Sequence, residues 1–462
     1  MEHVKPYIEE HRDRFLEELF ALIRIPSVSS VAEHKEDMIR AAEYWRKMLR
    51  EAGCNRSDLY ETAGNPIVYG EKLVDPSLPT ILVYGHYDVM PVDPVELWES
   101  QPFKPEVRNG KIYARGADDD KGQAFMHAKA FELMVRTGTL PCNVKFMIEG
   151  EEEVGSANLA PFCLQYKEML RSDIILVSDT GMISLATPSI TVGLRGLAYM
   201  QVEVTGPNAD LHSGIFGGAV ANPANVLAKM IASLTDEKGR ITIPGFYDDV
   251  AEVSDTEREE MAKAPFDETV YKRNLDVDEL SGEAGFTTKE RTGIRPTLDV
   301  NGIWGGYTGE GSKTVLPSKA WAKISMRLVP NQDYMKIGKL FEAHFFAIAP
   351  KSVRVKVETL HGGQAYVSPI DTIGYQAASR ALETVLGKKP IPVRSGGSIP
   401  IIPQFEEILG VKTILLGFGL ETDAIHSPNE NYPLENFYKG IETIPYFYGY
   451  FTDSWIEERN RR

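Results

Sequence analysis

Four apolar runs of strand length each end in an acidic or histidine-bearing segment, and this repeated pattern constrains the fold more than any other feature of the chain. The runs and the residues that follow them are 80–85 with His86, 142–148 with 149–153, 174–178 with Asp179, and 413–418 with 421–426. Runs that are apolar at nearly every position are typical of parallel strands buried on both faces. Functional side chains of such sheets lie beyond the carboxyl ends of the strands, so the pattern predicts one shared site.

Segments with helical spacing of their apolar residues alternate with these runs, at 5–24, 36–52, 121–137 and 157–170. This alternation predicts an α/β domain with a largely parallel central sheet flanked by helices. The pattern changes near residue 189 and resumes after residue 362. We therefore expect one domain in two parts, 1–188 and 363–462, interrupted by an α+β domain at 189–362. Within the latter, the acidic segment 254–295 is expected to form solvated helices.

Composition and charge exclude several classes of protein. The 462 residues carry a formal net charge of −16 and show no basic face, so we expect no nucleic-acid partner. The longest apolar run, 413–420, is shorter than the roughly 18 residues that cross a bilayer, and no signal peptide is recognisable, so we expect no membrane partner. Three widely spaced cysteines indicate a cytoplasmic location and exclude a cysteine zinc site.

Each acidic cluster taken alone has a plainer explanation than metal binding. One aspartate suffices to cap a helix, but three stand together at 118–120, and they repel one another unless a cation lies nearby. The acidic segment 149–153 taken alone predicts only a solvated loop. His86 and Asp88 taken alone are a weak signal, although the Asp88 carboxylate can accept the second ring N–H of His86. Together the clusters predict a nitrogen and oxygen site for two divalent ions.

Eight strings of the chain resemble, in the same order, the aminoacylase/dipeptidase family of two-metal peptidases, in its cytosolic nonspecific dipeptidase or carnosine dipeptidase-like branch. They are GHYDVMP (85–91), RGADDDKG (115–122), EGEEEVGS (149–156), SDT (178–180), GPNADLHSG (206–214), SMRLVPN (325–331), GGSIP (396–400) and AIHSPNE (424–430). The resemblance implies a catalytic domain at 1–188 and 363–462. It implies that 189–362 is a lid domain through which two copies form a homodimer.

The resemblance also implies five metal ligands. Asp119 would bridge two ions, His86 and Asp179 would complete one site, and Glu153 and His426 the other. The cofactors would be two divalent ions per subunit, Zn²⁺ first and Mn²⁺ as the alternative.

Two further acidic residues have expected roles in catalysis, and one peptide bond beside the expected ligands has an unusual expected geometry. Glu152 would be the general base that activates a water shared by the ions. Asp88 would orient His86. In related proteins the peptide bond after the bridging aspartate is cis, which here is the bond between Asp119 and Asp120.

Substrate-binding residues are implied in the same way, mostly from the lid domain. Arg327 would bind the substrate carboxylate, because a guanidinium pairs with a carboxylate through two hydrogen bonds. Gly397 and Ser398 would add donors to that carboxylate, and Thr314 is a further candidate. His212 would stabilise the oxyanion from the partner subunit.

The resulting hypothesis is a dipeptidase that acts on short peptides with a free C-terminal carboxylate. Within the family, deacylases and carboxypeptidases usually have Glu where this chain has Asp179, whereas di- and tripeptidases usually have Asp. Two alternatives stay open. An N-acyl-amino-acid amidohydrolase would use the same metals and base, and a non-catalytic binding relative would be expected to lack a ligand or the base.

Overall fold

The computed structural model describes residues 2–461, apart from the side chains of residues 256 and 260. It divides into two compact units, each with an apolar core of its own. Unit 1 comprises Met1–Val192, Ser368–Val393 and Ile401–Arg462, and unit 2 comprises Gly193–Val367 and Arg394–Pro400. Beyond the two changes of pattern expected near 189 and 362, the chain returns to unit 2 for one short segment at 394–400.

The largest sheet has nine strands in the order β1-β2-β6-β3-β7-β17-β8-β15, with β16 paired to β8. The strands are β1 (Arg56–Tyr60), β2 (Ile67–Lys72), β3 (Thr80–His86), β6 (Asn143–Glu149), β7 (Ile174–Val177), β8 (Ser189–Leu194), β15 (Tyr366–Val367), β16 (Ile391–Ser395) and β17 (Thr413–Leu415). The four central strands, β6, β3, β7 and β17, are parallel. Antiparallel pairs flank them, so the sheet is mixed. The predicted α/β class is confirmed.

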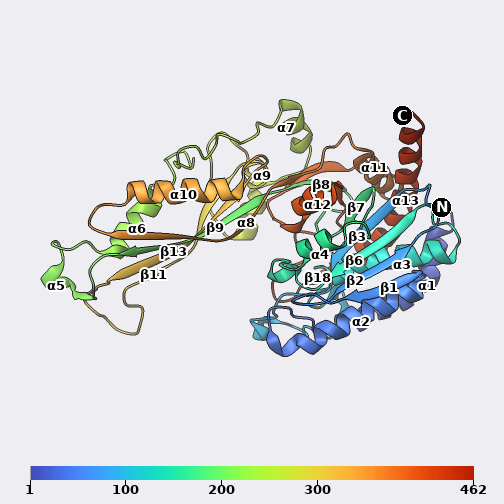
Figure 1. The fold of residues 1–462 in the computed structure, drawn as a ribbon, viewed down its shortest axis with the longest axis horizontal. Helices are drawn as coiled ribbons and strands as arrows, with labels where there is room; N and C mark the ends of the chain where they lie inside the picture. Colours follow the sequence, from blue (N-terminus) through green and yellow to red (C-terminus); the bar gives the residue numbers. More distant parts are fainter. Residues whose placement is uncertain (1, 462) are drawn as a thin grey trace. The chain divides into compact units, whose positions relative to one another are not determined.

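Helices flank both faces of this sheet in unit 1 (Figure 1). They are α1 (Val4–Ile23), α2 (Lys35–Ala52), α3 (Lys121–Arg136), α4 (Leu159–Gln165), α11 (Ile373–Leu386), α12 (Ile401–Leu409) and α13 (Leu434–Arg461). Side chains of β3 alternate between the two layers: Ile81 and Val83 join the core that includes α3, whereas the ring of Tyr84 lies 5.1 Å from that of Phe405 in α12. A small sheet adds β4 (Glu106–Arg108), β5 (Lys111–Tyr113) and β18 (Asn431–Pro433).

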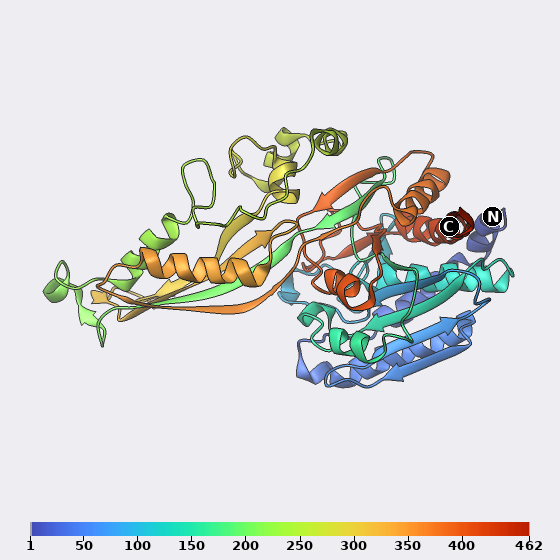
Figure 2. The same cartoon turned by 45° about the horizontal axis from the view of Figure 1, so that its top comes forward.

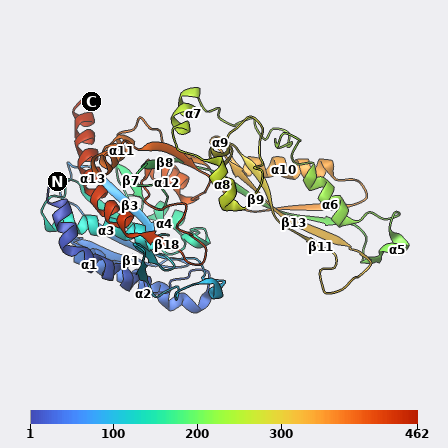
Figure 3. The same cartoon turned by 180° about the vertical axis from the view of Figure 1, so that it is seen from behind.

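Unit 2 is built on an antiparallel sheet with the order β11-β13-β9-β14. Its elements are β9 (Gly196–Thr205), β10 (Leu211–His212), α5 (Ser213–Phe216), α6 (Pro223–Ala232), α7 (Asp255–Ala262), α8 (Glu268–Leu275), α9 (Thr288–Gly293), β11 (Thr297–Gly305), β12 (Val315–Leu316), β13 (Lys319–Leu328), α10 (Tyr334–Ile348) and β14 (Arg354–Gly363). Helices α6 and α10 pack on one face of the sheet (Figures 2 and 3). Alternate residues of β9 and β13 are buried beneath them.

The segment 254–295 forms the expected helices α7, α8 and α9. It is less solvated than its composition suggests, because Glu283 and Glu290 are buried and paired with arginines. No helix within residues 2–461 is both long enough and apolar enough to cross a membrane.

Candidate metal centre

Neighbouring parallel strands bring their carboxyl ends to one edge of the sheet. His86, the last residue of β3, pairs with Glu149, the last residue of β6. A short 3₁₀ helix, Glu152–Val154, follows β6, and Asp179 follows β7 by two residues. Helix α3 begins at Lys121, directly after the three aspartates. The polar residues that follow these strands in the sequence therefore lie close together in the folded chain.

Two overlapping groups of donor atoms form at this edge. In the first, His86 Nε2 lies 3.2 Å from Asp119 Oδ1 and 3.9 Å from Asp179 Oδ2. In the second, His426 Nε2 lies 2.9 Å from Asp119 Oδ2 and 3.1 Å from Glu153 Oε2. Within each group the donor atoms lie within 4.8 Å of one another. Asp119 belongs to both groups and directs one carboxylate oxygen to each histidine.

The donor groups fit a pair of divalent cations. His86 Nε2 is fully buried and makes no hydrogen bond with the described part of the chain, although Asp119 lies within reach. Burial, and then the charge of Asp119, raise the pKa of Asp179 well above its usual range. Hydrogen bonds to Asp119 and then Glu153 raise the pKa of His426 to about 10. Crowded carboxylates with imidazole nitrogens are a donor set that hard and borderline divalent ions prefer.

Glu152 lies beside the donor groups with a free carboxylate. Among the described residues it has no hydrogen-bond or ion-pair partner for its side chain. Burial raises the pKa of Glu152 to about 8; the charge of His86 opposes this effect, and the charges of Asp119 and Glu153 reinforce it. A carboxylate whose pKa is raised by burial can take up and return a proton near neutral pH.

The Asp88 carboxylate connects His86 to the turn that carries Glu152. It accepts hydrogen bonds from the backbone N–H of Glu152 at 3.2 Å, from the backbone N–H of Glu153 at 3.1 Å and from the Ser29 hydroxyl at 2.7 Å. The hydrogen bond of His86 Nδ1 goes to the Asp88 backbone carbonyl at 3.1 Å, with the carboxylate slightly farther away at 3.3 Å. Asp88 thus holds Glu152 and Glu153 as well as His86.

The three consecutive aspartates have different surroundings. Asp119 faces both histidines, and the peptide bond from Asp119 to Asp120 is cis. Asp120 Oδ2 accepts the backbone N–H of His86 at 3.0 Å. The backbone N–H of Asp118 donates to Glu430 at 3.0 Å. Only the middle aspartate is a member of the donor groups.

Sequence reasoning missed Glu430, which is fully buried. Its carboxylate accepts backbone N–H groups of Gly116, Asp118 and Asp119 at 3.0, 3.0 and 3.1 Å, and it pairs with Arg115 at 2.8 Å. It therefore holds the loop that presents Asp119. The only available signal was that Glu430 ends the string AIHSPNE, which also contains a histidine.

In unit 2, Arg327 lies beside the segment 394–400. Arg327 Nη1 donates to the Ser398 hydroxyl at 2.9 Å, and that hydroxyl in turn donates to the backbone carbonyl of Arg195. The Gly397 N–H donates to Ser395 Oγ at 3.2 Å. The two donors expected from Gly397 and Ser398 are therefore both engaged within unit 2.

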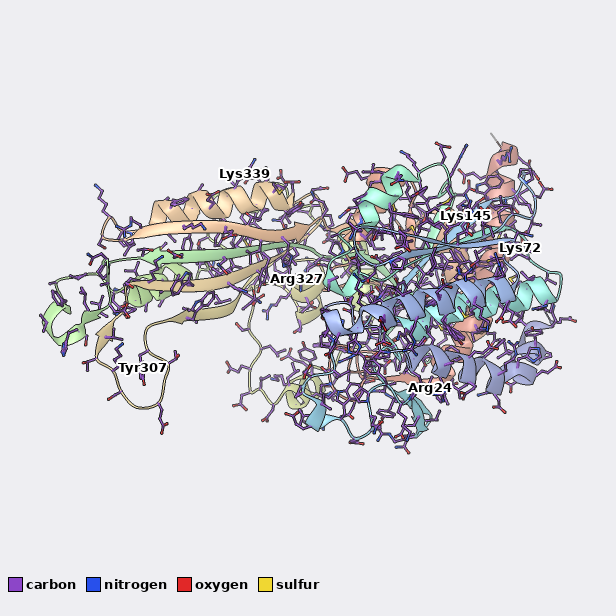
Figure 4. The ribbon with its side chains drawn as sticks, turned by 60° about the horizontal axis from the view of Figure 1, so that its bottom comes forward. Arg24, Lys72, Lys145, Tyr307, Arg327 and Lys339 are labelled. Atoms are coloured by element: carbon purple, nitrogen blue, oxygen red, sulfur yellow. The ribbon has the colours of Figure 1, made fainter. Side chains whose placement is uncertain are left out.

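His212 and Thr314 lie together, at the other end of the unit 2 sheet from Arg327. His212 pairs with Val315, and the Ser213 N–H donates to the Thr314 carbonyl at 3.0 Å. This group adjoins the start of β13, because the Asp210 carboxylate accepts the Ser318 N–H at 2.8 Å. Arg327 lies eight residues along β13 from Lys319, which corresponds to about 26 Å. Figure 4 shows Arg327 and the loop of Tyr307 at opposite ends of this sheet.

An α/β unit whose strand ends assemble two overlapping nitrogen and oxygen donor groups beside a free carboxylate fits the class of metal-dependent hydrolases. The chain belongs to the Peptidase family M20/M25/M40, whose sequence profile matches residues 82–448. The resemblance noted from its motifs is thereby confirmed, and the protein is a peptidase.

Individual relatives cover nearly the whole chain. It is 34% identical to the Cys-Gly metallodipeptidase dug1 of Schizosaccharomyces pombe, covering 94% of this chain and 95% of that protein. It is 32% identical to the human Beta-Ala-His dipeptidase, and the match covers 97% of this chain and 92% of that protein. Among solved structures, the M20 family metallo-carboxypeptidase Sso-CP2 from Sulfolobus solfataricus has a TM-score of 0.86 at 32% identity, covering 95% of this chain and 99% of that one.

Proposed function

We propose that the protein is a dinuclear metal-dependent dipeptidase that hydrolyses short peptides with a free C-terminal carboxylate. The observation that carries this proposal is the position of Asp119, whose two carboxylate oxygens face two different histidine-containing groups. The names of the dug1 and Beta-Ala-His relatives support a dipeptide as the substrate.

In the proposed site, Asp119 would be shared by two ions, His86 and Asp179 would complete one coordination shell, and Glu153 and His426 the other. When bound, two such ions would polarise the scissile carbonyl and lower the pKa of a water between them. We assign Zn²⁺ first and Mn²⁺ as the alternative, since imidazole suits the former and carboxylates suit both.

The protein's own contribution to the chemistry is proton transfer and orientation. Glu152 takes the proton of the attacking water and returns it to the departing amine. Asp88 orients His86 from one side and the backbone of Glu152 from the other. Arg327 binds the substrate carboxylate in unit 2, near Gly397 and Ser398.

We assign His212 to the oxyanion, with Thr314 beside it, in a homodimer that forms through unit 2. A dipeptide spans about 7 Å, whereas His212 and Arg327 of one copy are separated by several times that length. One substrate can contact both side chains only if a second copy supplies one of them. A cytoplasmic location is proposed because Cys54, Cys142 and Cys163 are buried free thiols.

The decisive variant is Glu152→Gln, which keeps the size of the side chain but removes its capacity to take up a proton. We expect kcat for Ala-Ala or Cys-Gly to fall by at least about 100-fold, while metal content stays at the wild-type level. The measurements are steady-state kinetics and elemental analysis of the same preparations. Full metal-dependent turnover by Glu152→Gln would refute the assignment of the base.

The deacylase alternative is tested on the wild-type enzyme with matched substrates. Ala-Ala and Cys-Gly are compared with N-acetyl amino acids at equal concentration. A dipeptidase has the higher kcat/KM for the unblocked peptides. Preference for the acylated substrates would instead identify an amidohydrolase with the same donor groups.

A further inference from the structure

Arg195 lies between β8 and β9 and is partly buried without an acidic partner. Among the described residues its guanidinium forms no ion pair, and it donates instead to neutral oxygens. Nε donates to the Gly396 carbonyl at 3.1 Å. Nη1 lies 3.5 and 3.4 Å from the carbonyls of Arg291 and Arg295. Nη1 also lies 3.4 Å from the Thr297 hydroxyl. A charged side chain that donates mainly to backbone carbonyls holds segments of chain together.

The segment that Arg195 holds most tightly is 396–398. The backbone N–H of Arg195 donates to the Gly397 carbonyl at 3.0 Å, and the backbone carbonyl of Arg195 accepts a hydrogen bond from the Ser398 hydroxyl. There is no spare room at Gly396, where a Cβ would meet the Thr292 carbonyl at 2.8 Å and Arg195 Nη2 at 3.0 Å. Arg195 and the end of α9 therefore clamp this segment between them.

The clamped segment in turn orients Arg327. The Ser398 hydroxyl donates its hydrogen bond to the Arg195 backbone carbonyl. Its oxygen is therefore free to accept a hydrogen bond from Arg327 Nη1, at 2.9 Å. The hydrogen bonds link the Arg195 carbonyl, the Ser398 hydroxyl and the Arg327 guanidinium, in that order. Ser398 thus acts on Arg327 rather than standing free as a donor.

The two guanidiniums also form a positive centre that no described carboxylate neutralises through an ion pair. Burial, and then the charge of Arg327, lower the pKa of Arg195 to about 10. Two features offset part of this charge. The carboxylate of Asp299 acts on both guanidiniums, and the carbonyls at the end of α9 carry the partial negative charge of a helix's carboxyl end. What remains favours an anion at Arg327.

The helices of segment 254–295 hold those carbonyls in place. Thr287 and Glu290 form a capping box at the start of α9, and Glu290 also pairs with Arg258 at 2.5 Å. Arg295 pairs with Glu283 at 2.7 Å. These paired charges anchor α9 against Arg195.

We propose that Arg195 is a positioning residue for carboxylate recognition: it fixes the Gly396–Ser398 segment so that Ser398 aims Arg327 at the substrate carboxylate. This rests on the proposed dipeptidase function. It adds a residue outside the recognisable motifs, and it gives the helical segment 254–295 a part in substrate binding.

The test compares Arg195→Gln with Lys336→Gln in the metal-loaded enzyme, using Ala-Ala and Ala-Ala amide. Lys336 is a suitable control because it is also in unit 2 and its partner, Asp249, lies 2.6 Å away and takes no part in anchoring α9. We expect Arg195→Gln to raise KM for Ala-Ala about tenfold while kcat changes less than about twofold. The amide has no carboxylate for Arg327, so the KM of Arg195→Gln for the amide is expected to stay at the wild-type value. Lys336→Gln is expected to keep the wild-type KM for both substrates.

Two further variants separate positioning from charge and from stability. Arg195→Lys restores the charge without the planar set of donors, so it is expected not to recover KM. Ser398→Ala removes the hydroxyl that links the Arg195 carbonyl to Arg327 but leaves the Arg195 guanidinium unchanged. Its effect on KM is expected not to add to that of Arg195→Gln. Full recovery by lysine, or additive effects, would overturn the proposal.

Hydrogen exchange of peptide 394–400 provides a readout that does not depend on activity. Faster exchange is expected in Arg195→Gln than in wild type and Lys336→Gln. If the wild-type enzyme hydrolyses neither peptide, the proposed function fails, and exchange still decides the role of Arg195. Unchanged exchange, or equal KM changes for the acid and the amide, refutes the positioning role.

Discussion

At the scale of single residues, Asp88 illustrates how a carboxylate acts on the site through backbone contacts. Its carboxylate accepts hydrogen bonds from the backbone N–H groups of Glu152 and Glu153 and from the Ser29 hydroxyl. The Asp88→Asn side chain has one acceptor oxygen and must turn an N–H toward one of these donors. We expect kcat for Ala-Ala to fall about 10- to 100-fold, as measured by steady-state kinetics, because Glu152 is displaced.

Ser29→Ala is the matched control for this prediction. It removes one hydrogen bond to the same carboxylate but leaves both amides paired, so kcat is expected to change less than about threefold. Wild-type kcat in Asp88→Asn would show that the two amide contacts do not position the base.

At the scale of structural elements, Glu430 joins two loops that carry candidate metal ligands from distant parts of the chain. One loop precedes α3 and presents Asp119, and the other precedes β18 and presents His426. Glu430→Gln breaks the pair with Arg115 and leaves a buried charge unpaired, which costs about 3–5 kcal/mol. We expect a lower melting temperature and a metal affinity reduced about 10- to 100-fold, measured by competition with a chromogenic chelator.

The double variant Arg115→Gln with Glu430→Gln separates these two effects. Removing both charges is expected to recover part of the melting temperature but not the metal affinity. Glu442→Gln, which alters a buried glutamate of α13 paired with Lys439, controls for loss of an ion pair elsewhere. Wild-type metal affinity in Glu430→Gln would contradict its role in presenting Asp119.

At the scale of the whole molecule, the separation of His212 and Arg327 along unit 2 leads to a prediction about assembly. We expect His212→Ala and Glu152→Ala each to be nearly inactive as homodimers. In mixed dimers, one site combines an intact Glu152 with an intact His212 from the other copy. Mixing the two variants is therefore expected to restore up to about a quarter of wild-type activity, since random pairing gives half mixed dimers with one good site each.

The control for this experiment is a mixture of His212→Ala with a double variant that carries both substitutions. No site in that mixture has both groups, so no activity is expected. Absence of recovery in the first mixture, with exchange of subunits verified by mass, would indicate a site completed within one chain.

The α/β class and the candidate donor residues could both be predicted before the fold was known. His86, Glu153 and Asp179 end or closely follow buried parallel strands, and such strands carry these residues to the same edge of a sheet wherever they stand in the chain. Asp119 instead lies in the loop before α3, and His426 lies in the long loop after β17. Local patterns predicted a shared site, the motif resemblance named the candidate ligands, and the structure brings their donor atoms together; they are His86, Asp119, Glu153, Asp179 and His426.

The polar groups that hold those donors in place became visible only in the folded chain. Glu430 contacts Arg115 across 315 residues of sequence, and Arg195 contacts Gly396 across 201. Such pairings leave no periodic signal, because each depends on how two loops meet rather than on spacing along one element. The acidic segment 254–295 shows the same limit: its composition predicts solvated helices, whereas its buried pairs anchor the helix end that Arg195 contacts.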